Sequence, residues 1–469
     1  MNAQFELPNE LWAEVFGYLP PTELTNVHLT SRRFYALSHP VFFRSLVLDP
    51  DHHAMLGNRD FIGVLERYTA PHIRKNVREL TVSFRFGRLT RTQRARGVSV
   101  PLKGPMLESL QCFKHLRVLQ CAFRNAETVD MATLGFSALP FLDKLTLSGC
   151  SLVCPASPTA QRIRVGHFAY TGIPRMEHLL RERRSHPDTG NESDSGVFRS
   201  FLSFLDPHTL HTLTLIPSFD VSPGAWLALD HDLYETFTEL RKVDVTVDGP
   251  FLAPVRNFVE ALPNVRDLIL HGAFRNVREP SFSGAVFHPE AEAARSTGSL
   301  RSYTGPAEYL PIFAAGAPAL TRVEITSASC FCHIRGALTQ IPTQHMTQLS
   351  LVLPLGHIHE WIDADEPIAS RLGEEGRTVA DFFAWFPKLE RLALKVTDNA
   401  AACDDEDGDN LDAFDVQLDS QLAIDVRGAL STIVRSVGVG VGVVVHWDVA
   451  ERTAAVLPDL AELLAELSS

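Results

Sequence analysis

Cysteine is scarce in this chain, which has only 7 among its 469 residues. So few cysteines, in an odd number, do not indicate a disulfide framework, and we therefore expect a reducing compartment, cytoplasmic or nuclear. Long apolar runs are missing too. No stretch of about 18 apolar residues occurs, so we expect no transmembrane helix and no membrane partner. The N-terminal residues lack the basic and apolar regions of a secretory signal, so we expect none.

Positive charge is in deficit, because 43 Lys and Arg residues stand against 56 Asp and Glu, a net charge of −13. A surface of this sign repels nucleic acid, so we expect no nucleic-acid partner. With 45% apolar and 21% charged residues, the composition is that of a folded protein. The length suits one small domain and one large domain.

Motifs for catalysis are also missing. The sequence has no G-x-S-x-G elbow, and its 19 histidines and 56 acidic residues give only chance pairings. We therefore expect no enzyme activity, no catalytic residue, no cofactor and no metal. The acidic run at 398–412 invites a calcium loop, but with Gly408 at the sixth position Phe414 stands where calcium needs a glutamate.

Two further motifs suggest ligands and fail on spacing. The run Val437–Val443, VGVGVGV, lacks the third glycine of a dinucleotide fingerprint, and a glycine-rich terminal strand is the better interpretation. The triplet Cys330-Phe-Cys332 is followed by His333, yet no second pair of zinc ligands lies nearby. We interpret these cysteines as buried residues at the end of a strand.

Residues 5–48 predict three short amphipathic helices. Pro8 suits the first turn of a helix, where its missing N–H is not needed. Apolar residues then recur every four positions, with aromatic residues one position further round, so one broad apolar stripe forms. These residues are Leu11, Val15 and Leu19, joined by Trp12 and Phe16.

Prolines and hydroxyl residues mark the helix boundaries. Pro20-Pro21 ends the first helix, and Thr22 is placed to cap the second. Thr30 or Ser31 is placed to cap the third helix, which we expect Pro40 to end. Three helices this short have too little core to be stable alone. We therefore expect them to pack on the rest of the chain or on another protein.

The residues of this segment follow one family pattern in order and spacing. They are Leu7-Pro8-x-Glu10-Leu11, Val15, Tyr18-Leu19, Leu24, Arg32-Arg33-Phe34, Leu37 and Phe43. With these residues, the segment from Phe5 to Leu48 resembles an F-box. His28 departs from the pattern, because the family often has a small residue or a cysteine there.

The resemblance implies docking on the Skp adaptor of cullin–RING ubiquitin ligases, and through that adaptor on a cullin. The adaptor-binding residues expected are Leu7, Pro8, Leu11, Val15, Phe16, Leu19 and Leu24. The chain would then be the substrate-recognition subunit of a Skp–cullin–F-box ubiquitin ligase, holding an unknown target protein while other subunits transfer ubiquitin. A non-catalytic adaptor or scaffold that binds the Skp adaptor without promoting degradation is the alternative.

Downstream of a short strand expected at Leu46–Leu48, one pattern recurs: an apolar residue, two variable residues, an apolar residue, one variable residue and an apolar residue. Its copies are Val77–Val82, Leu116–Cys121, Leu142–Leu147, Leu210–Leu215, Leu240–Val245, Val265–Leu270, Leu320–Ile325, Met346–Leu351 and Leu389–Leu394, with a degraded copy at Leu300–Tyr303. The alternating end of each copy predicts a strand, and helical segments at 258–262, 310–315 and 379–386 precede three of them.

Strands and helices that recur in this way predict a solenoid. The copies resemble irregular leucine-rich repeats, although only Leu142–Cys150 completes the pattern of that family. We therefore expect an α/β fold: a three-helix F-box at 1–48, an irregular leucine-rich-repeat-like α/β solenoid at 49–450 and a C-terminal helix at 451–469. A mixed α/β domain without repeats is the alternative.

Composition also marks segments that we expect to serve as flexible insertions or as a binding surface. The expected insertions are 181–196, 279–299 and 398–412. A positive cluster in this acidic chain consists of Arg85, Arg88, Arg91, Arg94 and Arg96. Arginine forks suit carboxylate and phosphate, so this cluster is a candidate site for acidic or phosphorylated targets, with a flexible basic loop as the alternative.

Overall fold

The structure is a computed structural model of the chain. It describes residues 7–48, 66–85, 110–124, 128–130, 136–153, 162–171, 201–216, 236–247, 252–272, 298–327, 331–355, 358, 379–397, 415–437 and 440–448. The chain divides into two compact units. The first unit comprises Met1–Leu240 and Asp244–Phe258, and the second comprises Arg241–Val243 and Val259–Ser469.

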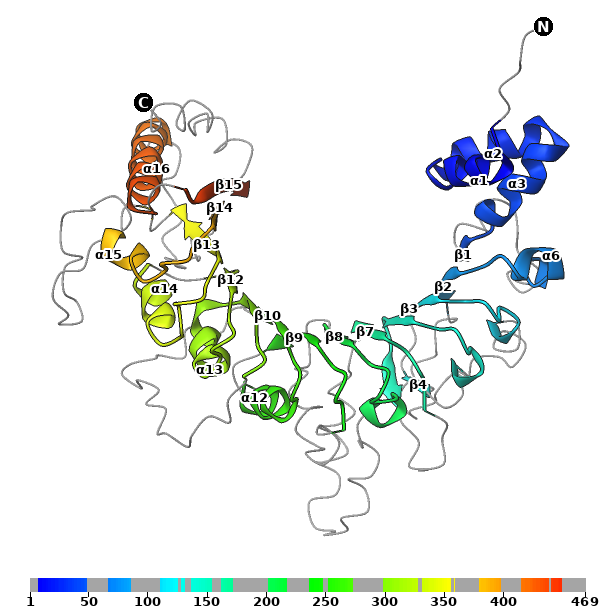
Figure 1. Ribbon diagram of the computed structural model, residues 1–469, viewed down its shortest axis with the longest axis horizontal. Coiled ribbons are helices and arrows are strands. Elements are labelled where there is room, and N and C mark those ends of the chain that lie inside the picture. Colours follow the sequence, from blue (N-terminus) through cyan, green and yellow to red (C-terminus); the bar gives the residue numbers. More distant parts are fainter. Residues whose placement is uncertain are drawn as a thin grey trace, which may run out of the picture. The chain divides into compact units, whose positions relative to one another are not determined.

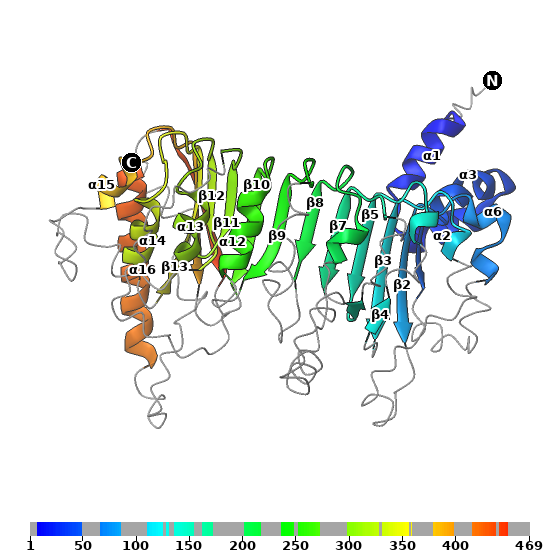
Figure 2. The ribbon, with the colours of Figure 1, turned by 90° about the horizontal axis from the view of Figure 1, so that it is seen from below.

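The main sheet has 13 strands, whose order in the sheet follows their order in the chain. They are β1 (Ser45–Leu48), β2 (Glu79–Arg85), β3 (Val118–Arg124), β5 (Lys144–Ser148), β7 (His167–Thr171), β8 (Thr212–Leu215), β9 (Lys242–Val247), β10 (Asp267–Gly272), β11 (Ser302–Gly305), β12 (Arg322–Ile325), β13 (Gln348–Pro354), β14 (Arg391–Thr397) and β15 (Gly442–Asp448). Every pairing whose register is described is parallel, and Figure 2 shows neighbouring strands pointing the same way. Two short strands, β4 (Thr128–Asp130) and β6 (Ser151–Val153), pair separately.

The recurring sequence pattern places apolar side chains in the interior at equivalent positions of successive strands. In the first unit, Leu80 of β2 pairs in register with Leu119 of β3, which pairs with Leu145 of β5, and all three are buried. Burying one such side chain stabilises the fold by about 1.5–3 kcal/mol. Each strand thus buries its apolar face against its neighbours, as in a repeat protein. The predicted α/β solenoid is confirmed, and each of the nine predicted copies forms a strand.

The residue immediately before each strand, here called the pre-strand residue, carries a regular hydrogen-bond pattern. The carbonyl oxygen of Arg44 accepts from the backbone N–H groups of Arg78 and Glu79, at 2.8 and 3.0 Å. The carbonyl of Arg78 accepts in the same way from Arg117 and Val118, at 2.7 and 3.0 Å. These bonds extend the parallel ladder by one residue, so the pre-strand residues of neighbouring repeats are stacked.

In the second unit, helices accompany the strands. These helices are α13 (Leu310–Ala314), α14 (Phe331–Leu338), α15 (Val379–Phe383) and α16 (Asp415–Val437). A further helix, α12 (Leu252–Ala261), crosses the boundary between the two units. Figure 1 shows α13, α14, α15 and α16 on one side of their strands. The helices predicted at 258–262, 310–315 and 379–386 correspond to α12, α13 and α15.

Two expectations for this part of the chain need correction or completion. Cys332 does not lie at the end of a strand, because Phe331–Leu338 is a helix that follows β12. The expected terminal strand is present as β15, but it begins at Gly442, and Val437 is the last residue of α16. Gly440, with φ of +100°, lies between them in a conformation that favours glycine.

The N-terminal helices are α1 (Asn9–Gly17), α2 (Pro21–Thr30) and α3 (Arg32–Phe42). Three helices were predicted, and Ser31 caps α3 as expected, because its side chain accepts from the N–H of Phe34 at 3.1 Å. Thr22 does not cap α2: Pro21 already occupies the first helical position, which its fixed φ favours. Pro40 does not end α3, which continues to Phe42 because the remaining N–H groups of its last turn still find carbonyls.

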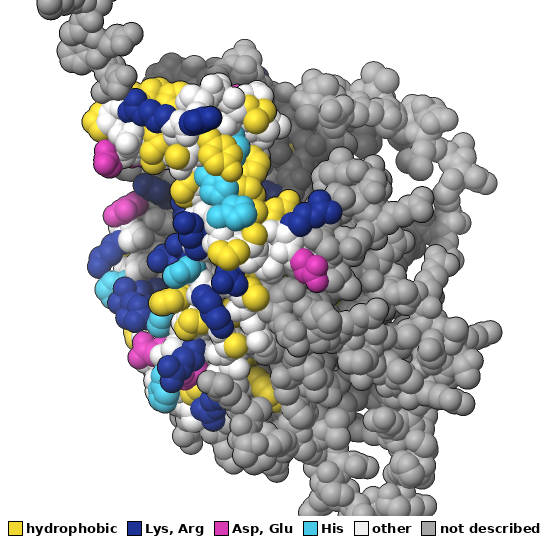
Figure 3. Space-filling view, turned by 90° about the vertical axis from the view of Figure 1, so that its right-hand side faces the viewer, with side chains coloured by type: hydrophobic (Ala, Val, Ile, Leu, Met, Phe, Trp, Pro, Cys, Tyr) yellow, Lys and Arg dark blue, Asp and Glu magenta, His cyan; other side chains and the backbone are white. Residues whose placement is uncertain are grey.

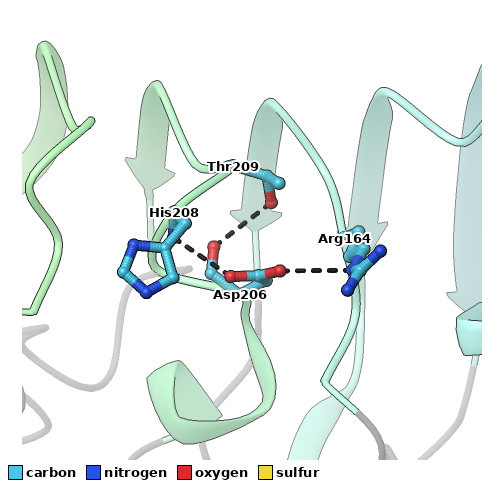
Figure 4. Close-up of polar contacts among 4 residues, drawn as sticks. All are labelled: Arg164, Asp206, His208 and Thr209. Atoms are coloured by element: carbon cyan, nitrogen blue, oxygen red, sulfur yellow. Dashed lines mark hydrogen bonds and ion pairs between the residues drawn. The ribbon is translucent and has the colours of Figure 1, made fainter.

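A polar clamp fixes the loops on either side of β7 in the first unit (Figure 4). Arg164 Nε lies 3.3 Å from Asp206 Oδ2, and Asp206 Oδ1 accepts from the backbone N–H of His208 at 3.1 Å. The backbone N–H of Asp206 donates to the carbonyl of Ile163 at 2.9 Å. Because the Arg164 side chain is 82% exposed, the ion pair contributes little, and the backbone bonds rather than the charges hold this loop.

Several predicted segments fall outside the described residues. They are the insertions at 181–196 and 398–412, nearly all of 279–299, the calcium alternative at 403–414 and the C-terminal helix at 451–469.

Candidate functional site

Helix α1 presents an exposed apolar stripe. Leu7, Leu11 and Val15 follow one another at intervals of four and are 43%, 45% and 43% exposed. Tyr18, three residues further, is 83% exposed, and Leu29 on α2 is 78% exposed. Residues three or four apart lie on one face of a helix, so Leu11 and Val15 share one face of α1, and Leu7 and Tyr18 flank that face just beyond the two ends of the helix. We call Leu7, Leu11, Val15 and Tyr18 the α1 stripe.

The opposite side of α1 forms the internal core of the three helices. Phe16 is 2% exposed, and its ring lies 5.7 Å from that of Trp12 and 5.4 Å from that of Phe34 on α3. Trp12 and Phe34 are 4.9 Å apart, and Leu24 of α2 is also buried. Tilted and edge-on aromatic contacts of this kind add to the energy of burial. These residues therefore hold α1 in place and leave the α1 stripe free for a partner.

Arg33 on α3 fixes the start of α1. Its Nε and Nη2 donate to Oδ1 of Asn9, at 3.1 and 2.9 Å, and Nη2 also lies 3.4 Å from the carbonyl oxygen of Leu7. A guanidinium can make several such bonds at once because its donors form a planar fork. The contact holds Leu7 and the first turn of α1 against α3.

His28 connects α2 with α3. Its Nδ1 lies 2.9 Å from Oγ of Ser38, a fully buried side chain, and its ring lies 4.2 Å from the tilted ring of Tyr35. Burial lowers the pKa of His28 below its ordinary value of 6.5, and the nearby His39 lowers this pKa further. The contact with Ser38 therefore forms with a neutral imidazole at physiological pH.

The C-terminal end of α3 packs on the first repeat. Nε2 of His39 lies 3.3 Å from the carbonyl oxygen of His72 on α6 (Pro71–Arg74), and the two rings stack at 5.8 Å. The ring of Phe43 lies 4.7 Å from that of His39 and 6.4 Å from that of Tyr68. The three helices thus pack on one another and on the repeats, yet the α1 stripe stays exposed. In Figure 3 apolar side chains lie at the surface of this end of the molecule.

The predicted adaptor-binding residues separate into two groups. Leu7, Pro8, Leu11 and Val15 are exposed, whereas Phe16 and Leu24 lie in the internal core and Leu19 is half-buried. Sequence reasoning did not include Tyr18 or Leu29 among the site residues. The position of Tyr18, three residues after Val15, is the signal that places it on the same stripe.

Of the predicted arginine cluster, only Arg85 lies within the described residues. It is the last residue of β2 and pairs in register with Arg124 of β3. Arg88, Arg91, Arg94 and Arg96 lie outside the described residues.

A second group of arginines, which was not predicted as a site, consists of the pre-strand residues Arg44, Arg78 and Arg117. Reading the repeats position by position was the available signal, because each of the three follows the first apolar residue of its copy. Arg44, Arg78 and Arg117 follow Phe43, Val77 and Leu116, respectively.

The described part of the chain shows neither a metal site nor a membrane-spanning helix. There, no three His, Cys, Asp or Glu side chains gather as metal ligands would. None of the helices described combines the length and the apolar character needed to cross a membrane.

The fold and the site together define an α/β repeat protein with a three-helix N-terminal domain that presents an apolar stripe. Residues 5–49 match the family model of F-box-like domains, so this N-terminal domain is F-box-like. No curated protein matches the chain. Among solved structures the chain is similar to TLR13 in the TLR13–ssRNA13 complex, with 13% sequence identity and a TM-score of 0.29. The alignment covers 79% of this chain and 46% of that one, so this chain spans about half the length of that protein.

Proposed function

We propose that this chain is the substrate-recognition subunit of a Skp–cullin–F-box ubiquitin ligase. The α1 stripe of the F-box-like domain docks on a Skp-type adaptor, which connects the chain to a cullin. The repeats hold a target protein, and other subunits transfer ubiquitin. The chain contributes proximity, because holding the target raises the effective concentration of its lysines at the ligase. A cytoplasmic or nuclear location is part of this proposal.

The observation that carries the proposal is the exposure of the α1 stripe inside the segment that matches the F-box-like model. An apolar surface along one helix face fits a partner that buries it. Each Leu or Val side chain removed from water adds about 1.5–3 kcal/mol when fully buried. The hydrogen bonds between Arg33 and Asn9 keep this helix in one position, which reduces the entropy lost on docking.

Reconstitution with purified subunits tests the proposal. The chain, a Skp-type adaptor and a cullin–RING complex are mixed, and the chain is expected to join the assembly and to become ubiquitinated on its own lysines when the transfer enzymes are added. Assembly without ubiquitin transfer, either to the chain or to a protein captured from cells with ligase activity blocked, would favour the alternative of a scaffold. Failure of the adaptor to bind would contradict both.

A further inference from the structure

The pre-strand residues of the first unit begin with three stacked arginines. In order they are Arg44, Arg78, Arg117, Asp143, Gly166 and His211, and the carbonyls of the first five each accept from the next repeat. Neighbouring strands lie about 4.8 Å apart, so the backbones of Arg44 and Arg117 are separated by about 10 Å. Three like charges at this spacing repel one another, which an external anion would relieve.

Further cations surround this column. Arg74 and Lys75 on and after α6, Lys114 before β3, and Lys144 at the start of β5 are all exposed. We call Arg44, Arg78 and Arg117 together with these four residues the basic strip. Figure 3 shows Lys and Arg side chains gathered on this face, below the apolar side chains. The strip stands out in a chain whose net charge is −13.

The two carboxylates beside the strip do not neutralise it. Oδ1 of Asp143 lies only 2.5 Å from the position that a Cβ on Gly166 would take, so this side chain is turned along the column toward Gly166. Glu79 is half-buried on β2. Among the described residues, no ion pair joins either carboxylate to a cation of the strip.

One arginine of the column is held in position. Nη1 of Arg78 donates to the carbonyl oxygen of Lys75 at 3.0 Å, and its side chain is half-buried. A guanidinium has five N–H donors, so most of them remain available to a ligand. Arginine forks bind carboxylates bidentately, and a fork that is already oriented loses less entropy on binding.

From this geometry we infer that the basic strip binds an acidic polypeptide segment, one with clustered Asp and Glu side chains, lying across the starts of β1, β2, β3 and β5. An extended chain advances about 3.3 Å per residue, so about four residues span the three arginines. A polypeptide can place neutral residues opposite Glu79 and Asp143. A uniformly charged nucleic acid cannot do so, and the negative net charge of the whole chain disfavours it further.

The second unit supplies a matched control. Its pre-strand residues begin with Arg241, Arg266 and Arg301, stacked through the same backbone bonds, of 2.7 to 3.0 Å. A triple substitution there removes the same charge from the same structural position. These arginines are accompanied by the exposed Asp267, and Arg241 already has a partner, so they do not form an equivalent strip.

Fluorescence anisotropy with the full chain tests this inference at about 50 mM salt, where charge interactions are weakly screened. The probe is a labelled peptide of about eight residues that alternates Glu and Ser. The Gln-Ser peptide and a single-stranded oligonucleotide of the same net charge are the comparisons. We expect the acidic peptide to bind, the Gln-Ser peptide not to bind, and the oligonucleotide to bind more weakly. Leu11→Asp should leave peptide binding unchanged, which separates this inference from adaptor docking.

Two triple arginine variants test where on the chain the acidic peptide binds. Changing Arg44, Arg78 and Arg117 together to Ala should weaken peptide binding at least about tenfold, since bonds to charged groups add about 1.5–3 kcal/mol each. The control triple variant of Arg241, Arg266 and Arg301 should change it less than about twofold. If an Ala variant has a lowered melting temperature, the corresponding Gln variants are used to repeat the comparison. Equal losses in both triple variants, no binding by the wild type, or preference for the oligonucleotide would overturn the inference.

Discussion

Arg33 holds Asn9 through two hydrogen bonds, from Nε and Nη2 to Oδ1, at 3.1 and 2.9 Å. The contact joins the first turn of α1 to α3 and so positions the α1 stripe from behind. Neither side chain belongs to the stripe. Arg33 is therefore a positioning residue for a surface that it does not itself form.

Replacing Arg33 with Ala should weaken adaptor binding by about three- to tenfold. The exposed hydrogen bonds contribute roughly 1 kcal/mol, which corresponds to a change of this size. The neighbouring Arg32 is exposed, so Arg32→Ala is the matched control and should change affinity less than about twofold. Calorimetry with purified adaptor measures both. Equal effects of the two substitutions would show that general charge, rather than the position of α1, matters.

The burial of His28, together with the nearby His39, should make the F-box-like domain less stable in mild acid. Because the pKa of His28 is lowered in the folded protein, the unfolded chain takes up a proton first as the pH falls below 6.5. Stability is therefore lost from about pH 6.5 downward until the folded pKa is reached, and it is fully present above pH 6.5. Thermal melts of wild type and His28→Asn between pH 7.5 and 5.5 measure the effect, and the melting temperature of the variant should fall less on acidification. An identical acid shift in the two proteins would contradict this role.

Two buried tyrosines, one in each unit, should stabilise their units by similar free energies. The hydroxyl of Tyr170 in β7 donates to the carbonyl of Cys150, and that of Tyr303 in β11 donates to the carbonyl of Pro306 at 2.7 Å. Changing either one to Phe leaves a buried carbonyl without its donor, which costs about 1–3 kcal/mol. Urea denaturation measures the loss, and Tyr18→Phe, at an exposed position, is the control. Unchanged stability of both core variants would contradict the packing described.

Cys121 and Cys150 should resist alkylation in the folded protein. Burial raises the pKa of Cys150 to about 12, and burial together with the neighbouring Cys150 raises the pKa of Cys121 well above its ordinary value. Because the thiolate is the reactive form, little of it is present at pH 8. Iodoacetamide labelling followed by peptide mass spectrometry should find both cysteines unmodified in the native chain and modified after denaturation. Rapid native labelling of either would show that the segment around it is not packed as described.

Most strands were predictable because Leu, Val and Ile carry the repeat pattern openly. β7 was missed because two aromatic residues replace aliphatic ones in its copy, Val165-x-x-Phe168-x-Tyr170. The helix α16 was missed because charged residues interrupt its apolar positions and no repeat marks it. Regular patterns thus reveal the repeats, whereas tertiary packing decides the elements that depart from them.

The site was predictable as a segment but not residue by residue. On α1 both faces are apolar, with Leu11 and Val15 on one side and Trp12 and Phe16 on the other. The sequence cannot tell which face meets α3, because that depends on the crossing of the helices and on aromatic contacts such as Phe16 with Phe34. For the same reason, the buried Leu24 could not be distinguished from an exposed contact residue.

Adaptor binding by Leu11→Asp tests the central claim most directly. Leu11 lies in the middle of the α1 stripe, and an aspartate there would lose apolar burial and place a carboxylate without a partner in the interface. Val444→Asp is the matched control, because Val444 is a similarly exposed apolar residue of the second unit. In a pull-down with purified Skp-type adaptor, wild type and Val444→Asp should bind, and Leu11→Asp should bind at least about a hundredfold more weakly while the repeats keep their melting transition. Equal binding by wild type and Leu11→Asp, or no binding by wild type, would contradict the account.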